Sequence, residues 1–315
     1  MIPDPDFGYI HAPGNTSRRQ RVDVSINREG FRGPEFAASR GDGRCRLLIL
    51  GDSVVFGWGA PQDSIFPARL QRLFDEVGLP CEVIPAGVGS WNTRHEAEFM
   101  KKRGFDYSPD VLLLVIVPND IEPSRKGRSG VSASELFPSA RPTSRLAQGI
   151  SRTWRVLVER SYVFSSAQHV RRVESSRVES ERSRYTSGSP ALRDASLALA
   201  MIAEGCKEHG VRFTAVEYAD SSTQFERAFT AAYSTALDSL CVEHYRIDRV
   251  GSDGRYRNSW VDGHPNSDGH RIIAEELFGV LRPIVVARLA SREGADSLES
   301  IPMRPPDPPE KSSPD

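Results

Sequence analysis

Short apolar segments alternate with longer amphipathic ones from residue 45 to residue 289. The segment at 111–117 reads VLLLVIV, so both of its faces are apolar. A strand of that kind is typical of a parallel sheet that is covered on both faces. Strands that alternate with helices are joined by crossovers within one sheet. The chain is therefore predicted to be an α/β protein whose parallel sheet lies between two layers of helices.

The individual elements are predicted from the period of the apolar residues in each segment. Strands are expected at 45–50, 81–86, 111–117, 211–218 and 244–250, and helices at 61–78, 93–104, 192–210, 224–241 and 267–289. Residues 1–43 form an N-terminal extension, in which the alternation at 22–26 predicts a short edge strand or a hairpin. The main domain spans 44–290, and the Pro-rich tail at 291–315 is expected to be disordered.

The main domain is interrupted by an insertion at 121–190. Its central part, 141–184, is rich in arginine and contains no lysine or aspartate. Apolar residues at helical spacing predict one or two amphipathic helices with a solvated basic face. The alternative is a lid over the site, whose arginines would meet an anionic substrate or a membrane surface.

Composition argues against several classes of protein. The chain has 315 residues and a formal net charge of −1, which gives no general reason to bind nucleic acid. No apolar run reaches the ~20 residues of a transmembrane helix. The first residues lack the pattern of a signal peptide, so the expected location is the cytoplasm, or outside it if an export segment has been removed. Four cysteines match no zinc or redox spacing, and all are expected to be buried, in strands (Cys45, Cys81) and in helices (Cys206, Cys241).

Polar residues follow three of the predicted strands, at the points where those strands end. The first strand is followed by GDS, the second by GVGS and the third by PND. Ligand sites of wound α/β sheets form beyond the C-terminal ends of the strands. Ser53 in the first of these loops is either a helix cap or a nucleophile, and a nucleophilic serine needs a histidine as base.

Of the seven histidines, His264 has the most suggestive surroundings. It lies in the loop WVDGHPNSDGH before the last predicted helix, two residues after Asp262. An aspartate can hold an imidazole in the tautomer that a base requires. His270 falls in the first turn of the helix and is expected to pack or to cap. For any one of these residues a purely structural role is the simpler interpretation, but such roles explain the four loops together poorly.

The four segments GDS, GVGS, PND and DGHPN, in this order, resemble the motif blocks of the SGNH (GDSL-type) hydrolase superfamily. The resemblance covers about 44–290, and the upstream INREGFRG resembles the entry segment of bacterial members. It implies a flavodoxin-like sheet and esterase, lipase or acyltransferase chemistry without a metal or other cofactor. Residue by residue, it implies that Ser53 is the nucleophile and a backbone oxyanion donor, Asn119 a side-chain oxyanion donor, His264 the base and Asp262 its orienter.

Two positions depart from the pattern of the superfamily. The usual oxyanion glycine falls on Ser90, with Gly89 directly before it, so either N–H group could be the donor. Asp262 and His264 are two residues apart, whereas many members have three. A backbone donor tolerates serine unless its φ is positive.

The sequence thus predicts a serine esterase acting on a small-molecule or glycan ester through an acyl-serine. An O-acyltransferase that moves the acyl group to a sugar or natural-product hydroxyl would need the same residues. The alternative from another class is a non-catalytic binding module with the same fold. The acyl group, the alcohol and the oligomeric state are not predicted.

Overall fold

The computed structural model describes residues 1–19, 22–37, 43–121, 189–219, 224–259 and 262–293. The predicted helices of the insertion and the alternative that it forms a lid lie outside these ranges. The predicted tail, 291–315, also lies outside them except for 291–293, which are helical and not disordered as expected. Within them, no helix is both long and apolar enough to cross a bilayer.

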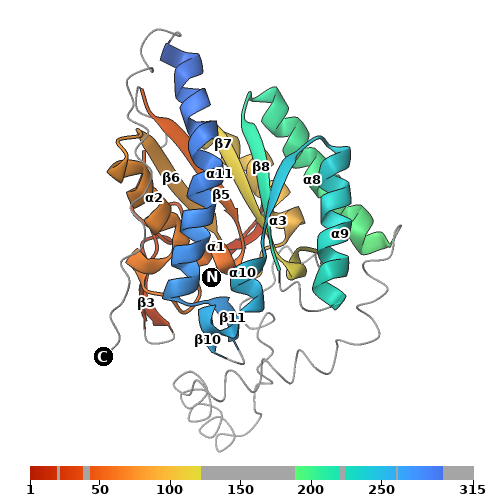
Figure 1. The fold of residues 1–315 in the computed structure, drawn as a ribbon, viewed down its shortest axis with the longest axis horizontal. Helices are drawn as coiled ribbons and strands as arrows, with labels where there is room; N and C mark the ends of the chain where they lie inside the picture. The colour runs from red at the N-terminus through yellow and green to blue at the C-terminus, as the bar shows by residue number, and fades with distance from the viewer. Residues whose placement is uncertain (20–21, 38–42, 122–188, 220–223, 260–261, 294–315) are drawn as a thin grey trace, which may run out of the picture.

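The centre of the molecule is a five-stranded parallel sheet, as predicted (Figure 1). Its strands are β5 (Cys45–Gly51), β6 (Cys81–Gly87), β7 (Val111–Ile116), β8 (Arg212–Tyr218) and β9 (Glu243–Ile247). They lie in the order β6-β5-β7-β8-β9. This is the 2-1-3-4-5 order of flavodoxin-like folds, which reverses direction between the first and third strands. The ends of β5 and β7 therefore flank the point where a site is expected.

Helices cover both faces of the sheet and confirm the three-layer architecture (Figure 1). On one face lie α2 (Phe66–Glu76) and the long α11 (Ser267–Glu293), and on the other α3 (Thr93–Lys102), α8 (Pro190–Glu208) and α9 (Gln224–Ser239). Successive residues of β5 alternate between the two cores: Leu48 and Leu50 face α3 and α8, whereas Leu47 and Ile49 face α2 and α11. All four side chains are fully buried, which explains the continuous apolar run.

Several boundaries differ from those predicted. The helix expected from residue 61 begins at Phe66, because Pro67 occupies its first turn, where a missing N–H costs nothing. The strand expected to reach residue 250 ends at Ile247, and α10 (Asp248–Ser252) follows. The last helix continues to Glu293. Cys241 is exposed in the turn after α9 with φ 54°, so its predicted place in a helix core was wrong.

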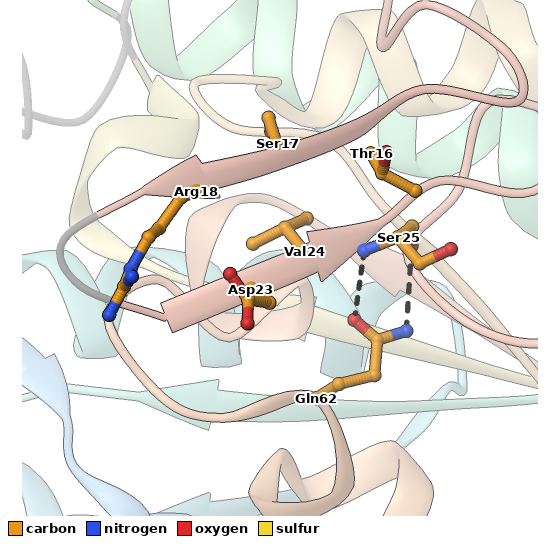
Figure 2. A pocket seen from close by; sticks show the side chains of 7 residues that line it. All are labelled: Thr16, Ser17, Arg18, Asp23, Val24, Ser25 and Gln62. Carbon is orange, nitrogen blue, oxygen red and sulfur yellow. Dashed lines mark hydrogen bonds between the residues drawn. The ribbon is translucent and has the colours of Figure 1, made fainter.

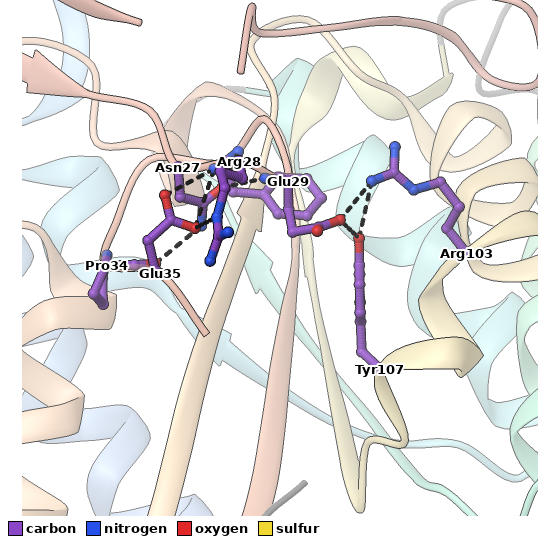
Figure 3. A network of polar contacts seen from close by, with 8 residues as sticks. Asn27, Arg28, Glu29, Pro34, Glu35, Arg103 and Tyr107 are labelled. Atoms are coloured by element: carbon purple, nitrogen blue, oxygen red, sulfur yellow. Dashed lines mark hydrogen bonds and ion pairs between the residues drawn. The ribbon is translucent and has the colours of Figure 1, made fainter. Parts of the chain in front are cut away.

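The N-terminal extension is built from two hairpins. Strands β1 (Ile2–Asp4) and β2 (Gly8–Ile10) form the first, and β3 (Thr16–Arg19) and β4 (Val22–Ser25) the second. Neither joins the central sheet. Beyond β4, Asn27 accepts two backbone N–H groups in its own loop, and Glu29 reaches Arg103 and Tyr107, each at 2.7 Å (Figure 3). The extension is thereby fastened to the segment after α3.

Short elements complete the end of the sheet that carries the polar loops. The helix α1 (Ser53–Phe56) follows β5, the 3-10 turn η3 (Pro118–Ile121) follows β7, and the turn η1 (Gln62–Ser64) precedes α2. After α10 come the turn η4 (Gly254–Tyr256) and a small hairpin of β10 (Arg257–Ser259) and β11 (Asp262–Pro265). This hairpin contacts both α10 and α1. Figure 1 shows α1, α10 and the hairpin together at this end.

Candidate active site

Ser53 begins α1 directly at the end of β5. Asp52 caps this helix: its Oδ1 accepts the N–H of Val54 at 2.9 Å. A Cβ atom on Gly87, at the end of β6, would lie 2.4 Å from the backbone nitrogen of Phe56. The glycine therefore lets α1 pack directly against the neighbouring strand, and Ser53 is held by a rigid connection.

Ser53, His264 and Asp262 form a continuous chain of hydrogen bonds. The Oγ of Ser53 lies 2.9 Å from Nε2 of His264, and Nδ1 of the same ring lies 2.5 Å from Oδ1 of Asp262. The serine and the histidine are 211 residues apart in the sequence. Because the carboxylate only accepts hydrogen bonds, it holds a proton on Nδ1 and leaves Nε2 of the neutral ring as an acceptor facing the serine.

The carboxylate of Asp262 has further partners. Asn258 donates to its Oδ2 at 3.4 Å, and the N–H of His264 donates to its Oδ1 at 3.1 Å. Burial by itself would raise the pKa of this carboxyl, but the hydrogen bonds and charge of His264 outweigh burial, and the pKa lies below its ordinary value. Asp262 is therefore ionised near neutral pH.

The loop after β6 has an unusual backbone at Ser90. The N–H of Trp91 donates to the carbonyl of Val88 at 3.0 Å, so Gly89 and Ser90 occupy the centre of a tight turn. Ser90 has a φ of 65°, in the left-handed region that favours glycine. Gly89 has no positive φ, and a Cβ there would meet nothing within 4 Å. The departure at Ser90 thus falls where the backbone would prefer glycine.

Tyr9 of the N-terminal extension supports this turn. Its hydroxyl donates to the carbonyl of Ser90 at 2.7 Å, and its own carbonyl accepts the indole N–H of Trp91 at 2.9 Å. The amide of Asn119, on the loop after β7, donates to the carbonyl of Trp91 at 3.3 Å. The loops after β6 and β7 are thereby joined to each other and to the extension.

Arg32 supports the loop that follows α1. This guanidinium is 1% exposed and donates to the carbonyls of Phe56 (3.1 Å), Gly57 (2.7 Å) and Ala60 (2.8 Å). Burial lowers its pKa to about 10. The carbonyl of Trp58 in the same loop accepts the amide of Asn258 at 2.8 Å. Arg32 thus fixes the loop from the extension, and Asn258 fixes it from the side of Asp262.

The aromatic residues near the motifs have different positions. Trp58 is partly exposed, with its ring centroid 6.3 Å from that of His264, so it forms a wall beside the histidine. Phe56 is buried and stacks on His11, and Trp91 is buried against Phe7. These two rings belong to the core.

Two buried titratable groups lie close to the site. His270 is fully buried, and its Nδ1 accepts the N–H of Phe66 at 3.2 Å, which fits the expected packing role. Burial lowers the pKa of His270 to about 3. Glu96, on α3, is also fully buried and interacts electrostatically with Asp52. Burial, followed by that charge, raises the pKa of Glu96 well above its ordinary value.

The contacts that Asp52, Asn258, Arg32 and Glu96 make around the site were not predicted from the sequence. Asp52 is adjacent to the serine, and Asn258 precedes Asp262 by four residues, so position was a weak signal for both. Arg32 lies in the INREGFRG segment, and the resemblance of this segment to an entry segment assigns no role to the arginine. Glu96 lies on the buried face of an amphipathic helix, where a carboxylate is rare.

A separate pocket of about 470 Å³ lies on the N-terminal extension (Figure 2). It is lined by Thr16, Ser17, Arg18, Asp23, Val24, Ser25 and Gln62. None of these residues belongs to the chain of hydrogen bonds at Ser53. In the described part of the molecule, no group of three or more His, Cys, Asp or Glu residues is arranged to hold a metal ion.

No protein-family model matches this chain, and no curated protein matches it. Solved structures do resemble it. The esterase EstA from Pseudoalteromonas sp., in a structure inhibited by monoethylphosphonate, is 12% identical and gives a TM-score of 0.49, over 76% of this chain and 98% of that one. A putative lipolytic protein of the G-D-S-L family from Desulfitobacterium hafniense is 10% identical with a TM-score of 0.46, over 76% and 100%. A family 3 carbohydrate esterase from Clostridium thermocellum is 14% identical with a TM-score of 0.46, over 78% and 98%.

Proposed function

We propose that this chain is a serine esterase of the SGNH (GDSL) type, which hydrolyses an ester through an acyl-serine. The observation that carries the proposal is the chain of hydrogen bonds from Ser53 through His264 to Asp262, at 2.9 and 2.5 Å. A serine hydroxyl is a weak nucleophile until a base takes its proton. A neutral imidazole whose Nδ1 proton is held by a buried carboxylate is such a base.

In the proposed reaction His264 takes the proton of Ser53 as Oγ attacks the carbonyl carbon of the ester. The imidazolium then gives that proton to the leaving alcohol, and the acyl-serine forms. Water, deprotonated by the same imidazole, releases the acid and restores Ser53. Asp262 stabilises the positive ring in both steps and stays ionised.

The developing oxyanion needs donors that are fixed in advance. The N–H of Ser53 lies in the first turn of α1, where backbone N–H groups have no acceptor within the helix. The second donor is an N–H of the turn after β6, at Gly89 or Ser90, and the third is the side-chain amide of Asn119. Only one of the two hydrogens of that amide is used by the carbonyl of Trp91.

Turnover of p-nitrophenyl acetate by the wild type and by Ser53→Ala tests the proposal. Loss of the nucleophile should lower kcat by roughly 10³-fold or more. Ser64→Ala is the matched control, because Ser64 lies in η1 and its hydroxyl donates to the neighbouring Asp63 at 3.3 Å. A phosphonate ester should label the wild type at Ser53 and leave Ser53→Ala unlabelled.

The same assays separate the other functions that these residues could serve. An ester formed on an added alcohol in place of free acid would identify an acyltransferase. A wild type that neither turns over the ester nor takes up the phosphonate, while it binds an acylated ligand, would identify a binding module and refute the proposal. Equal turnover by the wild type and Ser53→Ala would also refute it.

A further inference from the structure

The hydroxyl of Ser53 has two hydrogen-bond acceptors at the same distance. Its Oγ lies 2.9 Å from Nε2 of His264 and 2.9 Å from Oδ2 of Asp52. The second contact has no part in the mechanism proposed above. Asp52 is 3% exposed, and its other oxygen accepts the N–H of Val54. The carboxylate is therefore held in place by the helix cap while it contacts the nucleophile.

A serine hydroxyl carries only one proton. When His264 is neutral, its proton is on Nδ1, so both neighbours of Oγ accept and only one can be satisfied. When His264 is protonated, Nε2 donates to Oγ and the hydroxyl donates to Asp52, so every group has a partner. Every hydrogen-bonding group around Ser53 therefore has a partner only when His264 is protonated.

The charges around this arrangement come from several elements. Glu96 on α3 faces Asp52, Asp262 on β11 binds His264, and His270 on α11 interacts electrostatically with His264. Arg32 binds the loop after α1, and Asp120 after β7 accepts the N–H of Val117. Within the described residues, Ser53 and Val54 are the hydrogen-bond donors to the carboxylate of Asp52, and this carboxylate takes part in no ion pair there. Its attraction for the serine proton is therefore not offset by a salt bridge.

We infer that Asp52 is a positioning residue for the nucleophile, which competes with His264 for the proton of Ser53 and thereby favours the form of the site in which His264 is protonated over the neutral form that begins the reaction. This inference rests on the proposed function. It assigns to the acidic neighbour of the serine an effect on the pH range of activity, in addition to its capping of α1. Before Ser53 attacks the ester, its hydroxyl turns from Asp52 to Nε2 of His264, and no other group has to move.

Asp52→Asn separates the two roles of this residue. Asparagine caps a helix as well as aspartate does, so its Oδ1 retains the bond from Val54. Its Nδ2 donates to Oγ, which leaves the hydroxyl proton to Nε2 alone. The acidic limb of kcat/KM for p-nitrophenyl acetate is expected to move to lower pH by about one unit, which is tenfold in activity at a fixed pH on that limb. An unmoved limb would mean that Asp52 is only a cap and would overturn the inference.

Asp52→Ser tests the same inference if Asp52→Asn fails to fold. Serine is also a capping residue, carries no charge and is too short to reach the adjacent Oγ as the carboxylate does. It should move the limb in the same direction. Asp63→Asn is the matched control, because Asp63 is exposed in η1, and its profile should overlay that of the wild type.

A readout that does not depend on turnover separates this inference from the proposed function. The NMR titration of the His264 ring should have a lower midpoint in Asp52→Asn than in the wild type. The same midpoint in both proteins would overturn the inference even if the esterase activity is found. A wild type without turnover or phosphonate labelling would refute the proposed function, whatever the midpoint.

Discussion

One carboxylate oxygen of Asp262 binds His264 twice. Oδ1 lies 2.5 Å from Nδ1 of the ring and accepts the backbone N–H of the same residue at 3.1 Å. The two-residue spacing makes this possible, because a carboxylate commonly accepts the N–H two positions later in the chain. The short spacing thus lets the chain itself hold the carboxylate against the ring.

Asp262→Asn should lower kcat for p-nitrophenyl acetate by roughly 10³- to 10⁴-fold. The amide can donate to Nδ1, which favours the tautomer with its proton on Nε2, and that ring cannot accept the proton of Ser53. Asp268→Asn is the matched control, because Asp268 is exposed on the first turn of α11. The two variants should unfold at similar temperatures. Activity of Asp262→Asn within tenfold of the control would contradict the assignment.

Glu96→Gln should change how stability depends on pH. The pKa of Glu96 is raised by burial and by Asp52, so the folded chain keeps a proton that the unfolded chain loses above about pH 4.3. The stability contributed by this proton is complete below the unfolded pKa and is lost as pH rises toward the folded pKa. Glutamine does not titrate. The free energy of unfolding of Glu96→Gln, relative to the wild type, should therefore increase by up to about 1.4 kcal/mol per pH unit in that window.

Urea unfolding at pH 5 and pH 8 measures this difference. Glu98→Gln, on the same helix but partly exposed, is the matched control for the loss of a carboxylate from α3. An offset for Glu96→Gln that is the same at both pH values would mean that the buried carboxyl is ionised throughout, and would contradict the expected behaviour.

Arg32→Lys should destabilise the protein although it keeps the charge. An ammonium cannot reproduce the fork that binds three carbonyls, and all three of these carbonyls belong to buried residues. We expect a loss of about 3 kcal/mol in the free energy of unfolding. Because the loop also holds Trp58 beside His264, KM should change as well. Arg28→Lys, at an exposed arginine that pairs with Glu35, is the control and should change neither quantity. Equal stability of Arg32→Lys and Arg28→Lys would contradict the conclusion that Arg32 fixes the loop after α1.

The main sheet was predictable because burial on both faces leaves a plain signal. β5, β6 and β7 begin at the predicted residues, and each is an almost unbroken apolar run. The end of β9 was not predictable, because polar and apolar residues continue to alternate through HYRIDRV while the chain turns into α10 at Asp248. Cys241 was misplaced for a similar reason, since the helical pattern of α9 does not show that the chain leaves the helix two residues earlier.

The contacts around the site depend on tertiary structure, and this limits what sequence can predict. Ser53 and His264 could be proposed together because each lies in a loop of distinctive composition. The donation of Arg32 to three carbonyls depends on how the extension packs, and no local pattern encodes it. The positive φ of Ser90 was also not predictable, because serine gives no signal for a left-handed backbone.

Gly87→Ala should displace Ser53 without touching it. A Cβ on Gly87 would lie 2.4 Å from the nitrogen of Phe56 and 2.8 Å from the carbonyl carbon of Val55, so α1 must move away from β6. We expect a loss of roughly 3 kcal/mol in the free energy of unfolding. We also expect a fall in kcat that exceeds any change in KM, because the shift alters the distance from Ser53 to His264. Gly279→Ala is the matched control: a Cβ there meets nothing within 4 Å, and alanine should stabilise α11 by up to about 1 kcal/mol. If both variants were as stable and as active as the wild type, α1 would not depend on its close approach to β6.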